Sequence, residues 1–144
     1  MGIKCLSLNC HRSVAAVTVV ANSLTDHSIA FLQEPAYNKK RNKLLGLIGH
    51  KTFSSKGNGR PRTAIVAGKG VNAWQENKYG SRDMTVIIVR ADGVTTYFAS
   101  CYLDIVCGGQ PVCWQARPSL FSLGFVPFCP RAHYIKTCRM ASRP

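Results

Sequence analysis

Four polar residues whose side chains suit chemistry lie at the ends of apolar, strand-like segments of this sequence. They are Asn9, Glu34, Tyr102 and Asp104. Pro35 follows Glu34 directly, and a residue before proline favours extended backbone, which would hold the Glu34 carboxylate in one direction. A single polar residue at a strand end commonly marks only the end of that strand. Together these residues become a site if their strands end at the same edge of a sheet.

The amide of Asn9 and the carboxylate of Glu34 are oxygen donors of the kind that Mg²⁺ or Mn²⁺ takes. Mg²⁺ typically binds through one or two carboxylates and keeps several waters. A divalent ion stabilises charge on phosphoryl oxygens and lowers the pKa of a bound water, which suits phosphodiester hydrolysis. We therefore expect a weakly held metal ion at these two residues.

The elements that position these residues begin with a strand, a helix and a second strand. Residues 3–8 are apolar and alternate as a strand does, and residues 28–33 form a second apolar run. Between them, apolar residues recur at helical spacing, at Val14, Val17, Ala21 and Leu24. Ser13 is the candidate N-cap of this helix. The order predicts a βαβ unit.

Strand signals dominate the segment that begins at residue 63. Strands are predicted at residues 63–67, 84–90 and 95–105, and Asp92 with Gly93 is a hairpin turn signal between the last two. Following the βαβ unit, they predict a strand-rich α+β domain. If the strands run side by side in one direction, the polar residues at their ends gather on one rim of the sheet.

The charge of the chain indicates a polyanionic partner. Its 144 residues carry 19 Lys and Arg against 6 Asp and Glu, a net charge of +13. Such an excess is typical of proteins that bind nucleic acid, although a basic surface without a specific partner has the same composition. Basic residues gather in residues 38–43 and in the Gly-, Ser- and Pro-marked loop 54–62. The candidate DNA contacts are Lys39, Lys40, Arg41, Arg60 and Arg62.

The remaining composition is typical of an intracellular globular protein. The hydrophobic fraction is 46% and the charged fraction 17%. No apolar run approaches the roughly 18 residues of a membrane span, and the N-terminus does not read as a secretory signal. Seven cysteines without C-x-x-C spacing favour buried or incidental thiols over a disulfide framework or a zinc site. No protein partner can be inferred.

The composition changes near residue 106. All six acidic residues lie before it, whereas residues 106–144 contain four of the seven cysteines and five of the seven prolines. No helical or strand period persists there for more than a few residues. We expect residues 1–105 to form the domain, and residues 106–144 to be an unrelated or out-of-frame tail that is irregular and poorly ordered.

Five ordered segments carry a resemblance to a known family: "LSLNCHRS", "IAFLQEPAY", "RPRTAIVA", "SRDMTVIIV" and "YFASCYLDI". Residues 3–105 resemble the endonuclease domain of non-long-terminal-repeat retrotransposons, part of the endonuclease/exonuclease/phosphatase superfamily that includes deoxyribonuclease I. The resemblance implies a four-layer α/β-sandwich, incomplete in this chain, with the active site at one end. It also implies Mg²⁺-dependent nicking of target DNA and a nuclear location.

The resemblance assigns roles residue by residue. Asn9 matches the Asn that positions metal and phosphate, and Glu34 matches the principal metal-binding carboxylate. Tyr102 matches the Tyr whose hydroxyl approaches the scissile phosphate. Residues implied to lie near the site are Ser81, Asp83 and Asp104. His11 occupies a position that is often acidic or an amide in the family, which argues against a second metal ligand there.

The sequence also departs from the family pattern. No Asp follows Asp104, so the G-D-x-N and S-D-H motifs that complete the family's catalytic machinery have no counterpart. His133 lacks an Asp to orient it and is expected at the surface or in packing. We therefore expect a truncated, inactive endonuclease. The alternatives are a non-catalytic basic nucleic-acid-binding fragment and a phosphatase of the same superfamily, which the L-Q-E-P and Y-L-D segments favour less.

Overall fold

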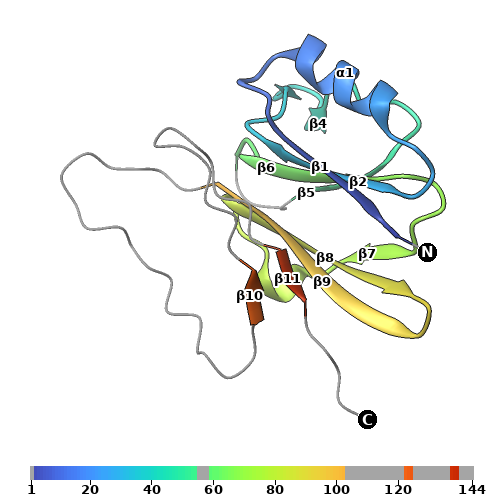
Figure 1. Cartoon of the computed structure of the whole chain (residues 1–144). Coiled ribbons are helices and arrows are strands. Elements are labelled where there is room, and N and C mark those ends of the chain that lie inside the picture. Colours follow the sequence, from blue (N-terminus) through green and yellow to red (C-terminus); the bar gives the residue numbers. More distant parts are fainter. Residues whose placement is uncertain (1, 55–58, 103–121, 125–136, 140–144) are drawn as a thin grey trace.

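A computed structural model describes residues 2–54, 59–102, 122–124 and 137–139 of the chain. In this part of the chain two β-sheets pack face to face, and helix α1 (Val14–Ser23) covers the outer face of the first sheet (Figure 1). This mixture of strands with one helix confirms the predicted α+β class. Helix, sheet and sheet make three layers, and the fourth layer of the predicted sandwich stays a prediction.

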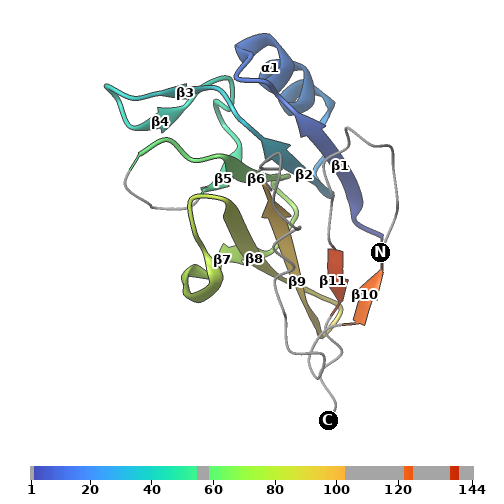
Figure 2. The same cartoon turned by 90° about the vertical axis from the view of Figure 1, so that its left-hand side faces the viewer.

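The first sheet has four strands in the order β1-β2-β6-β5. They are β1 Lys4–Asn9, β2 Ser28–Gln33, β6 Thr63–Ala67 and β5 Lys51–Ser54. The second sheet has the order β10-β11-β9-β8-β7. Its strands are β10 Ser122–Gly124, β11 Thr137–Arg139, β9 Val94–Cys101, β8 Met84–Ala91 and β7 Ala73–Gln75. The remaining elements are the hairpin β3 Tyr37–Asn38 and β4 Lys43–Leu44 (Figure 2) and the 3₁₀ helix η1 Asn77–Tyr79.

The predicted strand–helix–strand start of the chain is confirmed. β1 runs parallel to β2, with Asn9 opposite Gln33 at their common carboxyl end. A parallel pair needs a crossover connection, which α1 supplies. The helix begins after Ser13, whose Oγ accepts a hydrogen bond from Ala16 N at 3.2 Å, as expected of an N-cap. Asn9 and the residue after Gln33 therefore lie at the same edge of the sheet.

β2 forms the centre of the core, because all six of its residues are buried. Its side chains alternate between two clusters: Ala30 and Leu32 pack under α1, whereas Ile29 and Phe31 pack between the sheets. The Phe31 ring meets the Phe98 ring of β9 with 6.0 Å between centroids. Burial on both faces explains why residues 29–32 of this strand are all apolar rather than alternating.

The predicted hairpin of the second sheet is confirmed at its turn and corrected at its end. Asp92 and Gly93 alone connect β8 and β9, with φ angles of 51° and 75°, as a type I′ turn requires. β9 ends at Cys101 rather than at residue 105, because its partner β8 begins at Met84, which pairs with Cys101. Residues 103–105 lie outside the described residues.

Several short strands were not predicted from the sequence. β3, β4, β5 and β7 have two to four residues each, too few to show a strand period. The basic run 38–43 forms the β3–β4 hairpin, where Asn38 Oδ1 accepts a hydrogen bond from Arg41 N at 3.1 Å. Turn chemistry of this kind accounts for the Asn within the run.

Of the predicted tail, residues 106–144, the structure describes β10 and β11 alone. β11 pairs with β9, and β10 pairs with β11, so both extend the second sheet. The boundary after residue 105 and the irregular character of the rest of the tail fall outside the described residues. Among the helices in the described ranges, none has the length and apolar character needed to cross a membrane.

Candidate functional site

Backbone hydrogen bonds join five separate segments at the carboxyl ends of β1 and β2. They run from Arg12 N to Glu34 O (2.8 Å), from Glu34 N to Arg62 O (2.8 Å), from Arg62 N to Arg82 O (3.1 Å) and from Tyr102 N to Asp83 O (2.8 Å). These bonds connect the loops that flank the paired strands. Each bond satisfies a backbone N–H group that has no partner within the strands. The loop side chains are consequently held over one end of the two sheets.

The end of β9 lies beside the end of β2. Two hydrogen bonds join these ends, from Gln33 Nε2 to Cys101 O (3.0 Å) and from Ser100 Oγ to Leu32 O (3.3 Å). Tyr102 therefore reaches the same end of the molecule as Asn9 and Glu34. The sequence predicted one rim of one sheet, and this is corrected, because β9 belongs to the second sheet. The site spans the ends of two packed sheets.

Three residues at this end adopt the left-handed backbone region, which residues other than glycine rarely take. The φ angles are 44° at His11, 64° at Arg12 and 44° at Glu34. The extended backbone predicted for Glu34 from Pro35 is therefore wrong. Arg62 O and Arg12 N bind the Glu34 peptide groups from both sides, and these bonds outweigh the local preference before proline. Strain of this kind concentrates at functional sites.

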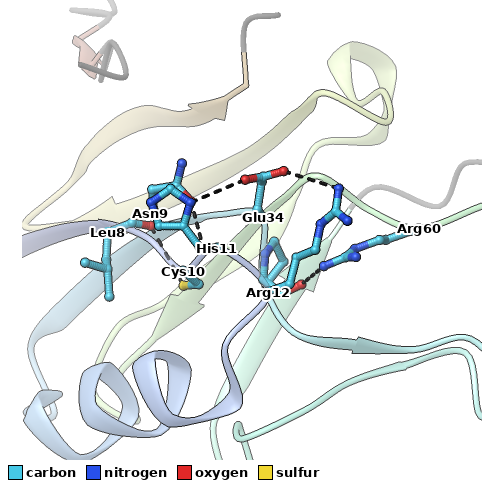
Figure 3. A network of polar contacts seen from close by, with 8 residues as sticks. Leu8, Asn9, Cys10, His11, Arg12, Glu34 and Arg60 are labelled. Carbon is cyan, nitrogen blue, oxygen red and sulfur yellow. Dashed lines mark hydrogen bonds and ion pairs between the residues drawn. The ribbon is translucent and has the colours of Figure 1, made fainter. Parts of the chain in front are cut away.

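The Glu34 carboxylate faces two basic side chains of the turn between β1 and α1 (Figure 3). Its Oε1 lies 3.7 Å from Arg12 Nη2 and its Oε2 lies 3.9 Å from His11 Nδ1, while its side chain is 18% exposed. Asn9 Oδ1 accepts a hydrogen bond from His11 N at 2.9 Å, which shapes the turn that carries both basic residues. Glu34 is thus a counterion, and the Asn9 amide supports the turn.

A cavity of about 190 Å³ lies beside Glu34. It is lined by Arg12, Glu34, Arg60, Arg62 and Arg82, which we call the arginine pocket. Burial and then the positive charge of Arg12 lower the pKa of Arg60, and the Glu34 carboxylate opposes this shift. The guanidinium groups of Arg12 and Arg60 are therefore close enough to repel each other.

Two of these arginines are held in place by contacts outside the cavity. Arg60 Nη2 donates a hydrogen bond to Pro35 O at 3.0 Å (Figure 3). The Arg62 guanidinium carbon lies 3.8 Å from the centroid of the Tyr102 ring, and its Nη1 lies 3.2 Å from Asp83 Oδ1. The Asp83 contact is an ion pair without hydrogen-bond geometry, and Asp83 Oδ1 accepts no hydrogen bond from the residues that the structure describes. Guanidinium groups fixed in this way lose little freedom when they bind an anion.

The arginine pocket does not fit a divalent cation held by the chain's own residues. Glu34 is the one carboxylate of the lining, it already faces Arg12, and four guanidinium groups repel a cation. Across the ranges that the structure describes, no three His, Cys, Asp or Glu side chains gather so as to hold a metal ion. The same charges favour an anion that offers several oxygen acceptors, as a phosphate does.

The structure brings many of the predicted site residues to this end of the sheets. Those placed here are Asn9, Glu34, Arg60, Arg62, Ser81, Asp83 and Tyr102. Ser81 Oγ accepts a hydrogen bond from Asp83 N at 3.3 Å. Lys39, Lys40 and Arg41 lie instead in the exposed turn between β3 and β4, apart from the lining of the arginine pocket. Asp104 and His133 lie outside the described residues.

Arg12 and Arg82 line the pocket, but sequence reasoning assigned neither of them to the site. Each is a direct neighbour of a residue that it singled out: Arg12 follows His11, and Arg82 lies between Ser81 and Asp83. The available signal was a basic residue beside each of these motif positions. These basic side chains form a pocket only when the folded strands bring their loops together.

Cys10 is part of the packing at this end and not of its chemistry. Its side chain is 1% exposed, in the cluster under α1, and burial raises the pKa of the thiol to about 11. The group is therefore a neutral thiol at physiological pH, which is neither a good metal ligand nor a good nucleophile.

Comparisons with known proteins show a likeness in fold. No family model matches the chain, and no curated protein matches it. The fold is similar to a solved structure described as the endonuclease domain of TRAS1, a telomere-specific non-LTR retrotransposon, with a TM-score of 0.56 and 18% sequence identity. The match covers 72% of this chain and 45% of that chain, so the chain spans less than half the length of the structure that it matches. The fold of the described residues is endonuclease-like.

Proposed function

We propose that the chain binds the phosphate backbone of DNA at the arginine pocket, as a nuclease-like domain that does not hydrolyse DNA in its 144-residue form. The observation that carries the proposal is the convergence of four guanidinium groups at the sheet ends of a fold similar to a retrotransposon endonuclease domain. The net charge of +13 supports the same class of partner, because phosphate neutralisation dominates the affinity of proteins for DNA.

Arginine suits this role because its planar guanidinium donates two parallel hydrogen bonds to phosphate oxygens. Arg60 and Arg62 are already oriented, by Pro35 O and by the Tyr102 ring. The Arg12 side chain is 65% exposed and can turn toward a ligand that enters the cavity. Contacts to phosphate carry no base information, so binding should depend little on DNA sequence.

Hydrolysis requires an aligned water and a general base in addition to a bound phosphate, and a positioned base alone contributes about 10²–10⁴-fold. Glu34 is the one acidic group of the lining, and His11 is 76% exposed with its Nδ1 3.9 Å from Glu34. No Asp follows Asp104 in the 144 residues, so the family's two later motifs have no counterpart there. We therefore propose binding without cleavage, and no step of it passes through Mg²⁺ or Mn²⁺.

The proposal is tested by fluorescence anisotropy of a labelled DNA duplex across a salt series. The logarithm of the binding constant should fall linearly with that of salt concentration, with a slope of about −0.9 per phosphate neutralised. Arg82→Gln should weaken binding to all sequences alike and reduce the slope by about 1. The matched control is Arg90→Gln, which removes the same charge from an exposed side chain near the other end of β8 and should leave the slope unchanged. Affinity that does not respond to salt, or equal losses in both variants, would contradict the proposal.

A further inference from the structure

We infer that the arginine pocket takes the terminal phosphate monoester of a DNA strand, a dianion, in preference to an internal phosphodiester. This inference rests on the proposed function, since it names the kind of phosphate that the same pocket recognises. Three features of the pocket carry it: the balance of its charges, its size and the repulsion among its arginines.

The charge balance matches a dianion. Four guanidinium groups line the cavity with the Glu34 carboxylate, and Asp83 lies against Arg62 from outside the lining. These groups leave two positive charges unbalanced. A phosphate monoester carries about −1.5 to −2 near pH 7, whereas each internal phosphodiester carries a single negative charge. A monoester therefore neutralises the pocket more completely.

The size of the pocket also favours a phosphate group by itself. Its volume of about 190 Å³ lies below the roughly 300–1,000 Å³ of pockets that enclose drug-sized ligands. The volume leaves no room for a whole nucleotide. A monoester presents three terminal oxygens as strong acceptors, while a diester has a chain continuing from both sides. A strand end can thus place its phosphate inside the cavity, while a continuous strand must lie across the opening.

The repulsion between Arg12 and Arg60 gives the bound anion a further role. The pKa of Arg60 is lowered by burial and by the charge of Arg12, and Glu34 compensates for part of this. The Arg12–Glu34 pair is loose, because its atoms lie 3.7 Å apart and the Arg12 side chain is 65% exposed. Arg12 can therefore exchange Glu34 for a phosphate oxygen at little cost. A dianion relieves more of the repulsion than a monoanion does.

The test compares four labelled oligonucleotide duplexes that share a common sequence and differ at a recessed strand end. One carries a 5′-phosphate, one a 3′-phosphate and one hydroxyl groups, and a fourth is one nucleotide longer with hydroxyl ends, which adds a diester instead of a monoester. Anisotropy at a fixed, moderate salt concentration should give about tenfold tighter binding for a phosphorylated end, the effect of one additional charge-assisted hydrogen bond. The 5′ and 3′ arms identify which strand end the pocket takes.

Two variants separate the pocket from general charge effects. Arg82 and Arg90 are both exposed. Arg82→Gln should abolish the preference for the phosphorylated end, whereas the Arg90→Gln variant should retain that preference. Inorganic phosphate, balanced for ionic strength with chloride, should weaken binding of the phosphorylated duplex more than binding of the hydroxyl-ended duplex. Equal affinity for phosphorylated and hydroxyl ends would overturn the inference while leaving the proposed function in place. Failure to bind any of the duplexes at low salt would overturn the proposed function itself.

Discussion

Substitution of Glu34 by Gln distinguishes an anion pocket from a metal site most directly. The two carboxylate oxygens of Glu34 face Arg12 and His11, and Gln keeps the length of the side chain while removing its charge. The backbone of residue 34 stays fixed, because its N–H and C=O bond to Arg62 and Arg12 irrespective of the side chain. In an anion pocket the loss of this negative charge should tighten DNA binding. In a metal site the same loss of charge should weaken DNA binding.

The magnitude follows from the Arg12–Glu34 contact. Two unit charges 3.7 Å apart attract each other by about 1 kcal/mol in water and by about 4 kcal/mol where the effective dielectric constant is near 20. The Arg12 side chain is 65% exposed, so solvent screening keeps the interaction at the lower value. Releasing Arg12 for a phosphate therefore contributes about 1 kcal/mol, which is about a fivefold decrease in the dissociation constant.

The assay is anisotropy with a labelled duplex at low salt, without and with Mg²⁺, and the folding of each variant is checked by thermal unfolding. The matched control is Asp26→Asn, an isosteric loss of one exposed negative charge in the turn before β2, whose start lies at the opposite end of that strand. It should change the affinity much less than Glu34→Gln. The anion-pocket reasoning is refuted if Glu34→Gln weakens binding and also removes a stimulation by Mg²⁺ that the unmodified chain shows.

Three further outcomes are expected. The 144-residue chain should not nick supercoiled plasmid above background with Mg²⁺ or Mn²⁺; metal-dependent nicking that Glu34→Ala abolishes would show that His11 or another group supplies the missing base. Ser13→Ala should lower the free energy of unfolding by about 1 kcal/mol in urea titrations, because Ala16 N loses its cap, and an unchanged midpoint would contradict the capping role. Gly68→Ala should cost about 3 kcal/mol or more, since the added Cβ would lie 2.1 Å from Thr25 O, and a stable Gly68→Ala variant would disprove that close approach.

The elements that the sequence predicted best are those whose signals are local. Ser13 before an apolar helical pattern located the start of α1, and the Asp92–Gly93 pair located the β8–β9 turn, because each signal is decided by neighbouring backbone atoms. β5 and β7 were missed because such short strands are held by long-range partners, β6 and β8, that no local pattern reveals.

The site was predicted in part for the same reason. The parallel pairing of β1 and β2 places Asn9 and Glu34 at one edge, and that follows from the βαβ pattern. The conformation of Glu34 did not follow, because hydrogen bonds from two distant loops override the preference that Pro35 imposes. The arginine pocket was also not predictable, since its members come from separate loops that meet only when the sheets pack.

The position of Glu34 among the arginines gives this carboxylate a role that differs from the one its sequence context implies. The backbone network brings the guanidinium groups together, and burial, followed by the positive charge of Arg12, lowers the pKa of Arg60. Glu34, 3.7 Å from Arg12, offsets some of that repulsion while the cavity holds no ligand. A bound phosphate would supply the same negative charge, and Glu34 would then oppose it. In the proposed function, the residue that resembles a metal ligand thus acts, with these neighbours, as an internal substitute for the phosphate.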